Sequence, residues 1–202
     1  MTTTETNSKK RLTVKFIAIT GILSALAAVI QMFEIPLPMI IPAFVKLDFS
    51  EIPAILATFL VSPISGIIVC LIKNVIHVLT SNSAGIGELA NFLLGCFMVL
   101  PAGIIYKLKP TKANAAVAMA VGAVISGVVS IFVNYYISYP FYTQLMPMDK
   151  IIEAYTALNG GVGSLWDCLI WFNMPFTIVK FLIDSLVVFF IYKPISKAIK
   201  NI

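Results

Sequence analysis

Long apolar stretches, separated by short polar links, follow one another along most of the chain. A helix needs roughly 20 apolar residues to cross the hydrocarbon core of a bilayer. Residues 14–33 provide the first such stretch, and others follow at 88–106, 114–137 and 167–192. The pattern predicts a multi-pass membrane protein that leaves little chain for a separate soluble domain.

The intervening residues 51–79 are also apolar, but Pro63 interrupts them. The residue before a proline is biased away from helical geometry, so two short helices, at 52–61 and 64–79, are expected rather than one long helix. The first is too short to cross a bilayer alone and needs the rest of the protein to shield its end. The expected fold class is therefore all-α: a single transmembrane domain, residues 1–202, built as a six-helix bundle.

Two of the connecting segments have a composition of their own. Residues 34–48 contain several prolines, which cannot continue a helix, so an ordered loop or a re-entrant segment is expected there. Residues 138–164 combine aromatic and acidic residues with the run Asn159-Gly160-Gly161-Val162-Gly163, a flexible loop whose glycines allow positive φ. This second segment is a candidate lid over a ligand.

Composition and charge agree with a lipid-embedded chain, because 59% of the residues are hydrophobic and only 11% are charged. The net charge of +5 does not indicate nucleic acid, since the basic residues lie in blocks between apolar stretches. With six helices and a break at Pro63, all three blocks fall on one side, so both termini are predicted to be cytoplasmic. The blocks are Lys9, Lys10, Arg11 and Lys15; Lys107, Lys109 and Lys112; and Lys193, Lys197 and Lys200.

The first basic block and the apolar run after it imitate a secretory signal peptide. The run continues to Phe33, however, and further apolar stretches follow it. We therefore expect an uncleaved first helix.

The sequence contains no catalytic or metal-binding motif. Cys70, Cys96 and Cys168 lack the spacing of metal ligands, and there is a single histidine. The phosphate-binding loop of ATPases is absent, as are the signatures of zinc and serine hydrolases. We expect no enzyme activity, no catalytic residues, no cofactor and no metal. Uphill transport would then draw its energy from a partner ATPase or from a coupled ion.

Polar side chains recur at helical spacing inside three of the apolar stretches. Ionisable groups in hydrocarbon are costly unless they are paired or face a polar cavity, so each is a functional candidate. The three faces consist of Lys73, Asn74 and His77; of Ser130, Asn134 and Ser138; and of Asn173, Thr177, Lys180 and Asp184.

Each face also has a purely structural interpretation. Lys180 and Asp184 can form an i,i+4 ion pair that neutralises itself within the bundle. His77 can be a satisfied structural group, and the serines can bond back to helix carbonyls. Asn134 is harder to explain in this way, since a buried carboxamide needs several partners.

Aromatic residues gather in the segments expected on the outer side. Tyrosine and tryptophan collect at headgroup level in any membrane protein, so an interfacial belt is one explanation. Stacking surfaces for a flat heteroaromatic ligand with polar edges are the other. The residues are Phe44, Phe49, Phe92, Tyr135, Tyr136, Tyr139, Phe141, Tyr142, Trp166, Trp171 and Phe172.

Small residues form two ridges at helical spacing on the first apolar stretch. Gly21 and Ala25 form one, and Ser24 and Ala28 form the other. Such ridges let a second helix approach closely, either within the bundle or from another membrane subunit.

Five segments together give the sequence a specific resemblance to a known family. They are Leu47 to Pro53 (LDFSEIP), Lys73 to His77 (KNVIH), Gly87 to Phe92 (GELANF), Asn134 to Tyr136 (NYY) and Pro175 to Lys180 (PFTIVK). In these segments the chain resembles the substrate-binding S components of energy-coupling factor (ECF) vitamin transporters, and among them the riboflavin-binding members.

The resemblance implies a ligand, a site and no catalysis by this subunit. Riboflavin would lie near the outer face under closing loops, with Asn134 and Lys180 bonded to the isoalloxazine edge. Asp48 and Glu51 would lie near the pocket mouth. The family pattern has asparagine where this chain has Thr177, so that contact would be shortened or taken over by Asn173. The candidate ligand-binding residues are Asp48, Phe49, Glu51, Lys73, Asn74, His77, Asn91, Asn134, Asn173, Thr177 and Lys180.

The resemblance also implies location in the cell membrane and two kinds of partner, a transmembrane coupling subunit and two cytoplasmic ATPase subunits. ATP-driven motion of the coupling subunit would topple the S component so that its pocket opens inward. Gly21, Ser24, Ala25 and Ala28 would form the docking face for that subunit. The outer loops are mostly acidic, so free riboflavin is expected to bind better than its phosphate. An S component for another vitamin, such as thiamin or a pyridoxine-like molecule, and a stand-alone ion-coupled transporter remain as alternatives.

Overall fold

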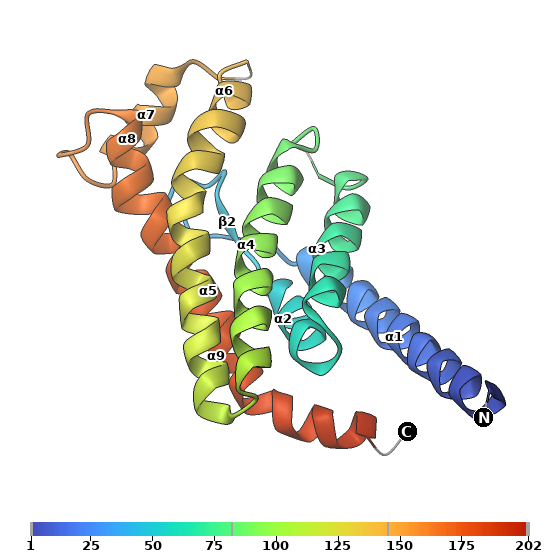
Figure 1. Ribbon diagram of the computed structural model, residues 1–202. Helices are drawn as coiled ribbons and strands as arrows, with labels where there is room; N and C mark the ends of the chain where they lie inside the picture. The colour runs from blue at the N-terminus through green and yellow to red at the C-terminus, as the bar shows by residue number, and fades with distance from the viewer. Residues whose placement is uncertain (1, 82, 145, 201–202) are drawn as a thin grey trace.

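Apolar helices that run alternately in opposite directions form most of the molecule (Figure 1). The computed structural model describes residues 2–81, 83–144 and 146–200. Its α-helices are α1 (Thr2–Gln31), α2 (Glu51–Leu60), α3 (Pro63–Val78), α4 (Ile86–Leu108), α5 (Lys112–Val133), α6 (Tyr139–Tyr142), α7 (Met148–Thr156), α8 (Leu165–Cys168) and α9 (Met174–Lys200). Two π-helical turns, η1 (Asn134–Ser138) and η2 (Leu169–Asn173), join α5 to α6 and α8 to α9. The described helices therefore make seven continuous segments.

Four of these segments are long and apolar enough to cross a membrane. They cover Val14–Gln31, Ile86–Leu108, Lys112–Tyr142 and Leu165–Lys197. The two shorter apolar helices, α2 and α3, meet at Pro63, which is the first residue of α3. Ser62 caps α3, because its Oγ accepts a hydrogen bond from the backbone N–H of Ser65 at 3.2 Å.

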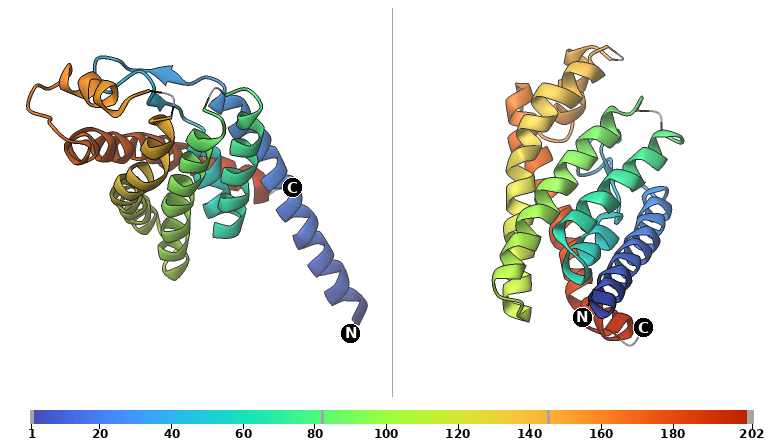
Figure 2. Two further views of the ribbon diagram at one scale, coloured as in Figure 1. Left: turned by 90° about the horizontal axis from the view of Figure 1, so that it is seen from above. Right: turned by 45° about the vertical axis from the view of Figure 1, so that its right-hand side comes forward.

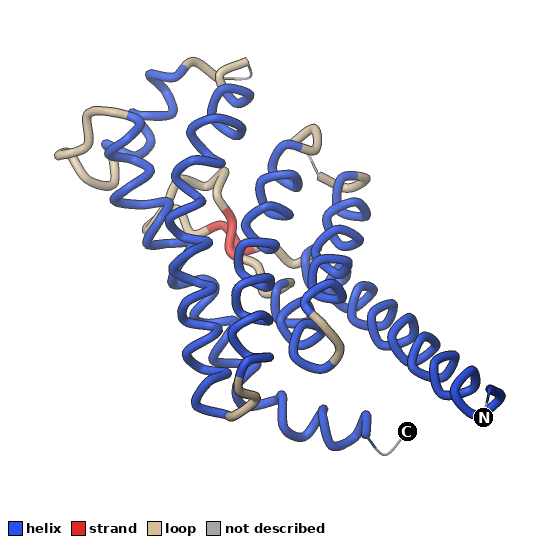
Figure 3. The backbone as a smooth tube through the Cα atoms, viewed as in Figure 1, coloured by secondary structure: helices blue, strands red, loops and turns tan. Residues whose placement is uncertain are grey.

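Two features differ from the sequence prediction. The segment predicted as a loop at 138–164 contains a helix, α7, so the bundle has one more helical segment than expected. The fold is also not purely helical, because β1 (Ile35–Pro36) pairs antiparallel with β2 (Lys46–Leu47). This two-stranded ladder, red in Figure 3, orders the proline-containing connection between α1 and α2 and lies at the edge of the bundle (Figure 2).

The glycines of the 138–164 segment do not adopt the positive φ that their lack of a side chain allows. Among the described residues, positive φ occurs only at Ala84 (52°) and Gly85 (88°), in the turn between α3 and α4. Gly160, Gly161 and Gly163 keep ordinary backbone angles. The tight turn therefore lies at the start of α4, where a glycine takes the left-handed conformation without steric cost.

Small residues allow the central helices to pack closely. Ala54 and Ala57 of α2, Ala102 of α4, and Ala118 and Ala123 of α5 are fully buried. Removing such surface from contact with lipid gains no hydrophobic free energy, so close packing supplies the attraction between these helices.

A second cluster of buried residues attaches α7 to the membrane helices. The hydroxyl groups of Tyr139 and Tyr155 lie 2.5 Å apart, and Tyr155 Oη donates to Asn173 Oδ1 at 2.6 Å. Asn173 Nδ2 in turn donates to Tyr139 Oη at 3.1 Å. This closed set of hydrogen bonds fixes the orientation of the Asn173 carboxamide.

The N-terminal end of α1 and the C-terminal end of α9 lie at the same end of the bundle as the turn between α4 and α5 (Figures 1 and 2). Lys107, Lys109 and Lys112 belong to that turn, and Lys193 and Lys197 belong to the end of α9. Lys15 of the first block lies on α1. The side chains of the other four residues of the predicted basic blocks, Lys9, Lys10, Arg11 and Lys200, lie outside the described part of the chain.

Candidate ligand-binding site

A cavity of about 490 Å³ lies between the α1–α2 connection and the ends of α3, α4, α5 and α9. This volume is within the range that small-molecule sites occupy. Seven of the eleven predicted ligand-binding residues line it: Asp48, His77, Asn91, Asn134, Asn173, Thr177 and Lys180. Residues far apart in the sequence therefore converge on one space.

The other four predicted residues lie outside the cavity lining. Glu51 and Lys73 are completely buried and pair with each other, with Lys73 Nζ 2.5 Å from Glu51 Oε1. Asn74 Oδ1 accepts a hydrogen bond from Gln31 Nε2 at 3.0 Å, and Gln31 does line the cavity. Phe49 is half-buried between Asp48 and Ser50. These residues can support the site but do not face its space.

A buried chain of charges connects the cavity wall to the Glu51–Lys73 pair. Lys180 Nζ donates to Asp48 Oδ2 at 2.6 Å, and Ser50 donates to Asp48 Oδ1 through its backbone N–H at 2.9 Å and through its hydroxyl. Lys73 Nζ then donates to Ser50 Oγ at 2.5 Å. Burial alone would raise the pKa of Asp48, but the Lys180 ammonium outweighs it, so the pKa of this carboxyl lies well below its usual range.

The Lys180–Asp48 bond corrects the i,i+4 interpretation of the α9 face. Lys180 pairs with a residue that precedes it by 132 positions, whereas both carboxylate oxygens of Asp184 have no hydrogen-bond partner. The pairing also ties the α1–α2 connection to α9, because Asp48 directly follows β2.

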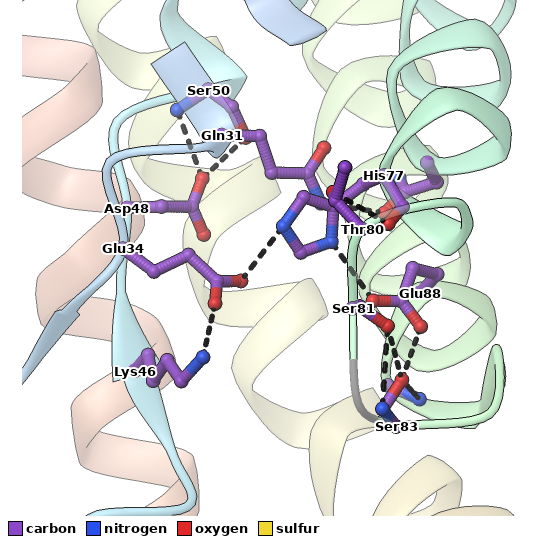
Figure 4. Close-up of polar contacts among 12 residues, drawn as sticks. Gln31, Glu34, Lys46, Asp48, Ser50, His77, Thr80, Ser81, Ser83 and Glu88 are labelled. Atoms are coloured by element: carbon purple, nitrogen blue, oxygen red, sulfur yellow. Dashed lines mark hydrogen bonds and ion pairs between the residues drawn. The ribbon is translucent and has the colours of Figure 1, made fainter. Parts of the chain in front are cut away.

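A second polar group ties the same connection to α3 and α4 (Figure 4). His77 Nδ1 lies 2.9 Å from Glu88 Oε1, and its Nε2 lies 3.7 Å from Glu34 Oε1. Lys46 Nζ donates to Glu34 Oε2 at 2.6 Å. His77 is thus a satisfied structural group, as one of the two interpretations predicted, and it also faces the cavity.

Sequence reasoning missed several of the lining residues. Gln31, Glu34, Lys46 and Glu88 line the cavity, yet none of them is among the predicted ligand-binding residues. Glu34 and Lys46 follow no helical period, because they lie in the non-helical connection. Only the folding of this connection brings Glu34 to His77 and Lys46 to Glu34.

The two π-helical turns each bring an asparagine to the cavity. Asn134 begins η1 and Asn173 ends η2, and π-turns inside helices are frequent at functional sites. The Ser138 hydroxyl, at the end of η1, is buried at the cavity wall without a hydrogen-bond partner. These positions leave amide and hydroxyl hydrogen-bonding capacity for a ligand.

The aromatic residues divide between the two explanations offered for them. Tyr136 and Trp171 are well exposed, at 67% and 69%, as in an interfacial belt. Phe44, Tyr139 and Tyr142 line the cavity instead. The cavity therefore combines aromatic walls with two lysines, three carboxylates and several amides.

The chain matches the family model described as "ECF transporter, substrate-specific component" over residues 15–192. It belongs to this family. The S component is thus a multi-pass membrane subunit of a transporter and not an enzyme. Its chain is 30% identical to riboflavin transporter RibU of Staphylococcus aureus over 90% of both chains. It is also 28% identical to riboflavin transporter FmnP of Bacillus subtilis, over 86% of this chain and 88% of the relative.

A solved structure of the S component of a bacterial ECF transporter has the same fold. It superposes with a TM-score of 0.74 at 29% identity, covering 93% of this S component and 99% of the solved chain. The agreement covers almost the whole of both chains.

The two small-residue ridges on α1 of the S component differ in their exposure. Ser24 and Ala28 are buried inside the molecule, on a helix that packs against α2 and α3. They serve packing within the bundle and are unavailable as a docking face, contrary to the prediction. Gly21 and Ala25 are exposed, and a side chain added at Gly21 would meet nothing within 4 Å.

Proposed function

We propose that this S component captures riboflavin from outside the cell in the 490 Å³ cavity and delivers it inward with an ECF energising module. The observation that supports this proposal best is that Asn134, Asn173 and Lys180 line one cavity of suitable size together with aromatic side chains. Its relatives RibU and FmnP, which share its length, are riboflavin transporters. The energising module would consist of a transmembrane coupling subunit and two ATPase subunits.

The lining groups match the chemistry of a flavin. The pyrimidine edge of isoalloxazine carries carbonyl acceptors and an imide donor, while the rest of the ring system is flat and apolar. Lys180 gives one N–H to Asp48 and retains two for carbonyl oxygens. Asn134 can accept from the imide and donate to a carbonyl. The carboxylates of Glu34, Asp48 and Glu88 around the cavity favour free riboflavin over its phosphate.

The proposed topology has six membrane crossings and cytoplasmic termini. It is supported by the lysines of the α4–α5 turn and of the end of α9, which lie at one end of the bundle. The cavity is lined by the connections at the other end, which would then face outward. Helix α2 is too short to cross the bilayer alone, so the neighbouring helices would shield its end.

Protein purified in detergent from cells grown with riboflavin is expected to be yellow, with the absorption bands of a flavin. An Asn134→Ala variant is expected to lose the colour because it loses the imide contact. Asn114→Ala is the matched control, since Asn114 bonds to Ile105 at the α4–α5 turn, away from the cavity. A colourless wild-type protein that binds thiamin or a pyridoxine-like vitamin in a ligand screen would reassign the substrate and leave the fold unaffected.

A bulky side chain at position 25 is expected to abolish assembly with the coupling subunit while riboflavin still binds. The exposed ridge of Gly21 and Ala25 would then no longer let a helix of that subunit approach closely. Co-purification of the coupling subunit with Ala25→Trp measures this effect. Ala120→Trp is the control, because Ala120 is equally small and exposed but lies on α5. Normal assembly of Ala25→Trp would exclude this face. Uptake that needs an ion gradient and no ATPase would instead favour the stand-alone ion-coupled transporter.

A further inference from the structure

Asp184 is a carboxyl group in the middle of a membrane-spanning segment with nothing bonded to it. It lies on α9 inside the candidate span Leu165–Lys197, and none of its surface is exposed. Both of its carboxylate oxygens lack a hydrogen-bond partner. An isolated carboxylate in such surroundings is one of the most costly groups that a protein can bury.

The charges around Asp184 do not balance it. The charged groups that act on it are Lys180 of its own helix, Asp48 before α2, Glu51 of α2 and Lys73 of α3. Helix α5, which also packs on α9, has a single ionisable residue, Lys112, at its far end. Three buried carboxyl groups therefore share two ammonium groups, which leaves one negative charge in excess if every group is ionised.

The hydrogen bonds show which carboxyl group is the extra one. Asp48 Oδ2 pairs with Lys180 Nζ at 2.6 Å, and Glu51 Oε1 pairs with Lys73 Nζ at 2.5 Å. Lys180 and Asp184 are one helical turn apart on α9, yet the ammonium bonds across the bundle to Asp48. If Asp184 were ionised, it would compete for that ammonium from the same helix.

We infer that Asp184 is a proton-binding residue, which holds the proton that makes this five-residue cluster neutral. A neutral Asp184 leaves Lys180 bonded to Asp48 and facing the cavity, so Asp184 acts as a positioning residue for Lys180. This second role rests on the proposed function, because it assumes that Lys180 contacts the ligand. The proton itself is required by burial and charge whichever ligand the cavity takes.

Infrared difference spectra between the wild type and its variants, recorded on the full chain in detergent, test directly whether Asp184 is protonated. The wild type is expected to give the C=O stretch of a protonated carboxylic acid, and Asp184→Asn is expected to lose it. Asp149→Asn, which changes an exposed carboxyl on α7, is expected to keep it. Absence of the band from the wild type would overturn the inference. The inference would also be overturned if sodium, compared with choline at equal ionic strength, stabilised the wild type but not Asp184→Asn. That result would mean that a bound cation, and not a proton, neutralises the excess charge.

The positioning role has a readout of its own in the pH profile of riboflavin binding. Ionisation of Asp184 at alkaline pH would draw Lys180 to its own helix, so wild-type affinity is expected to fall by about tenfold, as for loss of one charged hydrogen bond. Asp184→Asn is expected to give a flatter profile, whatever its absolute affinity. Parallel profiles for the two proteins would remove the positioning role and leave the infrared result standing. Failure of both proteins to bind riboflavin would instead count against the proposed function.

Discussion

Replacing Lys73 with methionine is expected to destabilise the folded protein by about 3–5 kcal/mol, the typical cost of removing one partner of a buried ion pair. Lys73 and Glu51 are both completely buried, so no water can solvate the carboxylate that remains. Lys73 also donates to Ser50, which in turn holds Asp48. The expected measurement is a large loss of monodisperse protein after extraction and a lower unfolding temperature in detergent.

Two further variants show whether the charge pair causes the effect. Lys150→Gln breaks the Lys150–Glu153 pair, whose side chains are 65% and 66% exposed, and should change stability little. Converting both buried partners, Lys73→Met with Glu51→Met, should recover much of the lost stability, because no unpaired charge is left behind. Wild-type stability of Lys73→Met alone would show that Glu51 is neutral or reaches another partner.

The sequence predicted the membrane helices better than it predicted their connections. Length, hydropathy and the proline at position 63 indicated where helices begin and end, because these depend on local properties of the chain. Helix α7 was missed because it has only nine residues and is polar enough to resemble a loop. The β1–β2 ladder has two residues in each strand, too few for a period to be recognised.

The candidate site was predictable to the extent that its residues share helix faces. Asn173, Thr177 and Lys180 follow one another at helical spacing, and all three reach the cavity. The face of α3 divides instead, since His77 lines the cavity while Lys73, one turn earlier, lies outside it in a buried ion pair. Spacing shows which side chains share a face, but the packing of neighbouring helices decides how deep each one lies.

The partner of Lys180 was the least predictable feature of the site. Helical spacing suggested Asp184, four residues away, and the structure gives Asp48 instead. Asp48 lies in a connection whose path is set by the β1–β2 ladder and by the contacts of Glu34 with His77 and Lys46. Such a long-range pair cannot be read from the pattern of one segment.

Loss of the Lys180 ammonium is expected to weaken riboflavin binding by about 100-fold or more, the range for truncating one member of a buried, hydrogen-bonded charge pair. Lys180→Met removes both the proposed donor to the flavin carbonyl and the partner that holds Asp48 in place. Titration of riboflavin fluorescence quenching with purified protein measures the change. Lys193→Met, at the opposite end of α9, is the matched control and should bind normally.

The double variant Lys180→Met with Asp48→Asn separates the two roles of this lysine. Because the second substitution removes the unpaired carboxylate, the double variant is expected to regain stability relative to Lys180→Met. It should still fail to bind riboflavin, since the ammonium donor is absent. Recovery of binding together with stability would mean that Lys180 acts only through Asp48 and the path of the α1–α2 connection. The recognition of the flavin edge would then fall to Asn134 and Asn173, whose carboxamides face the same cavity from the two π-turns.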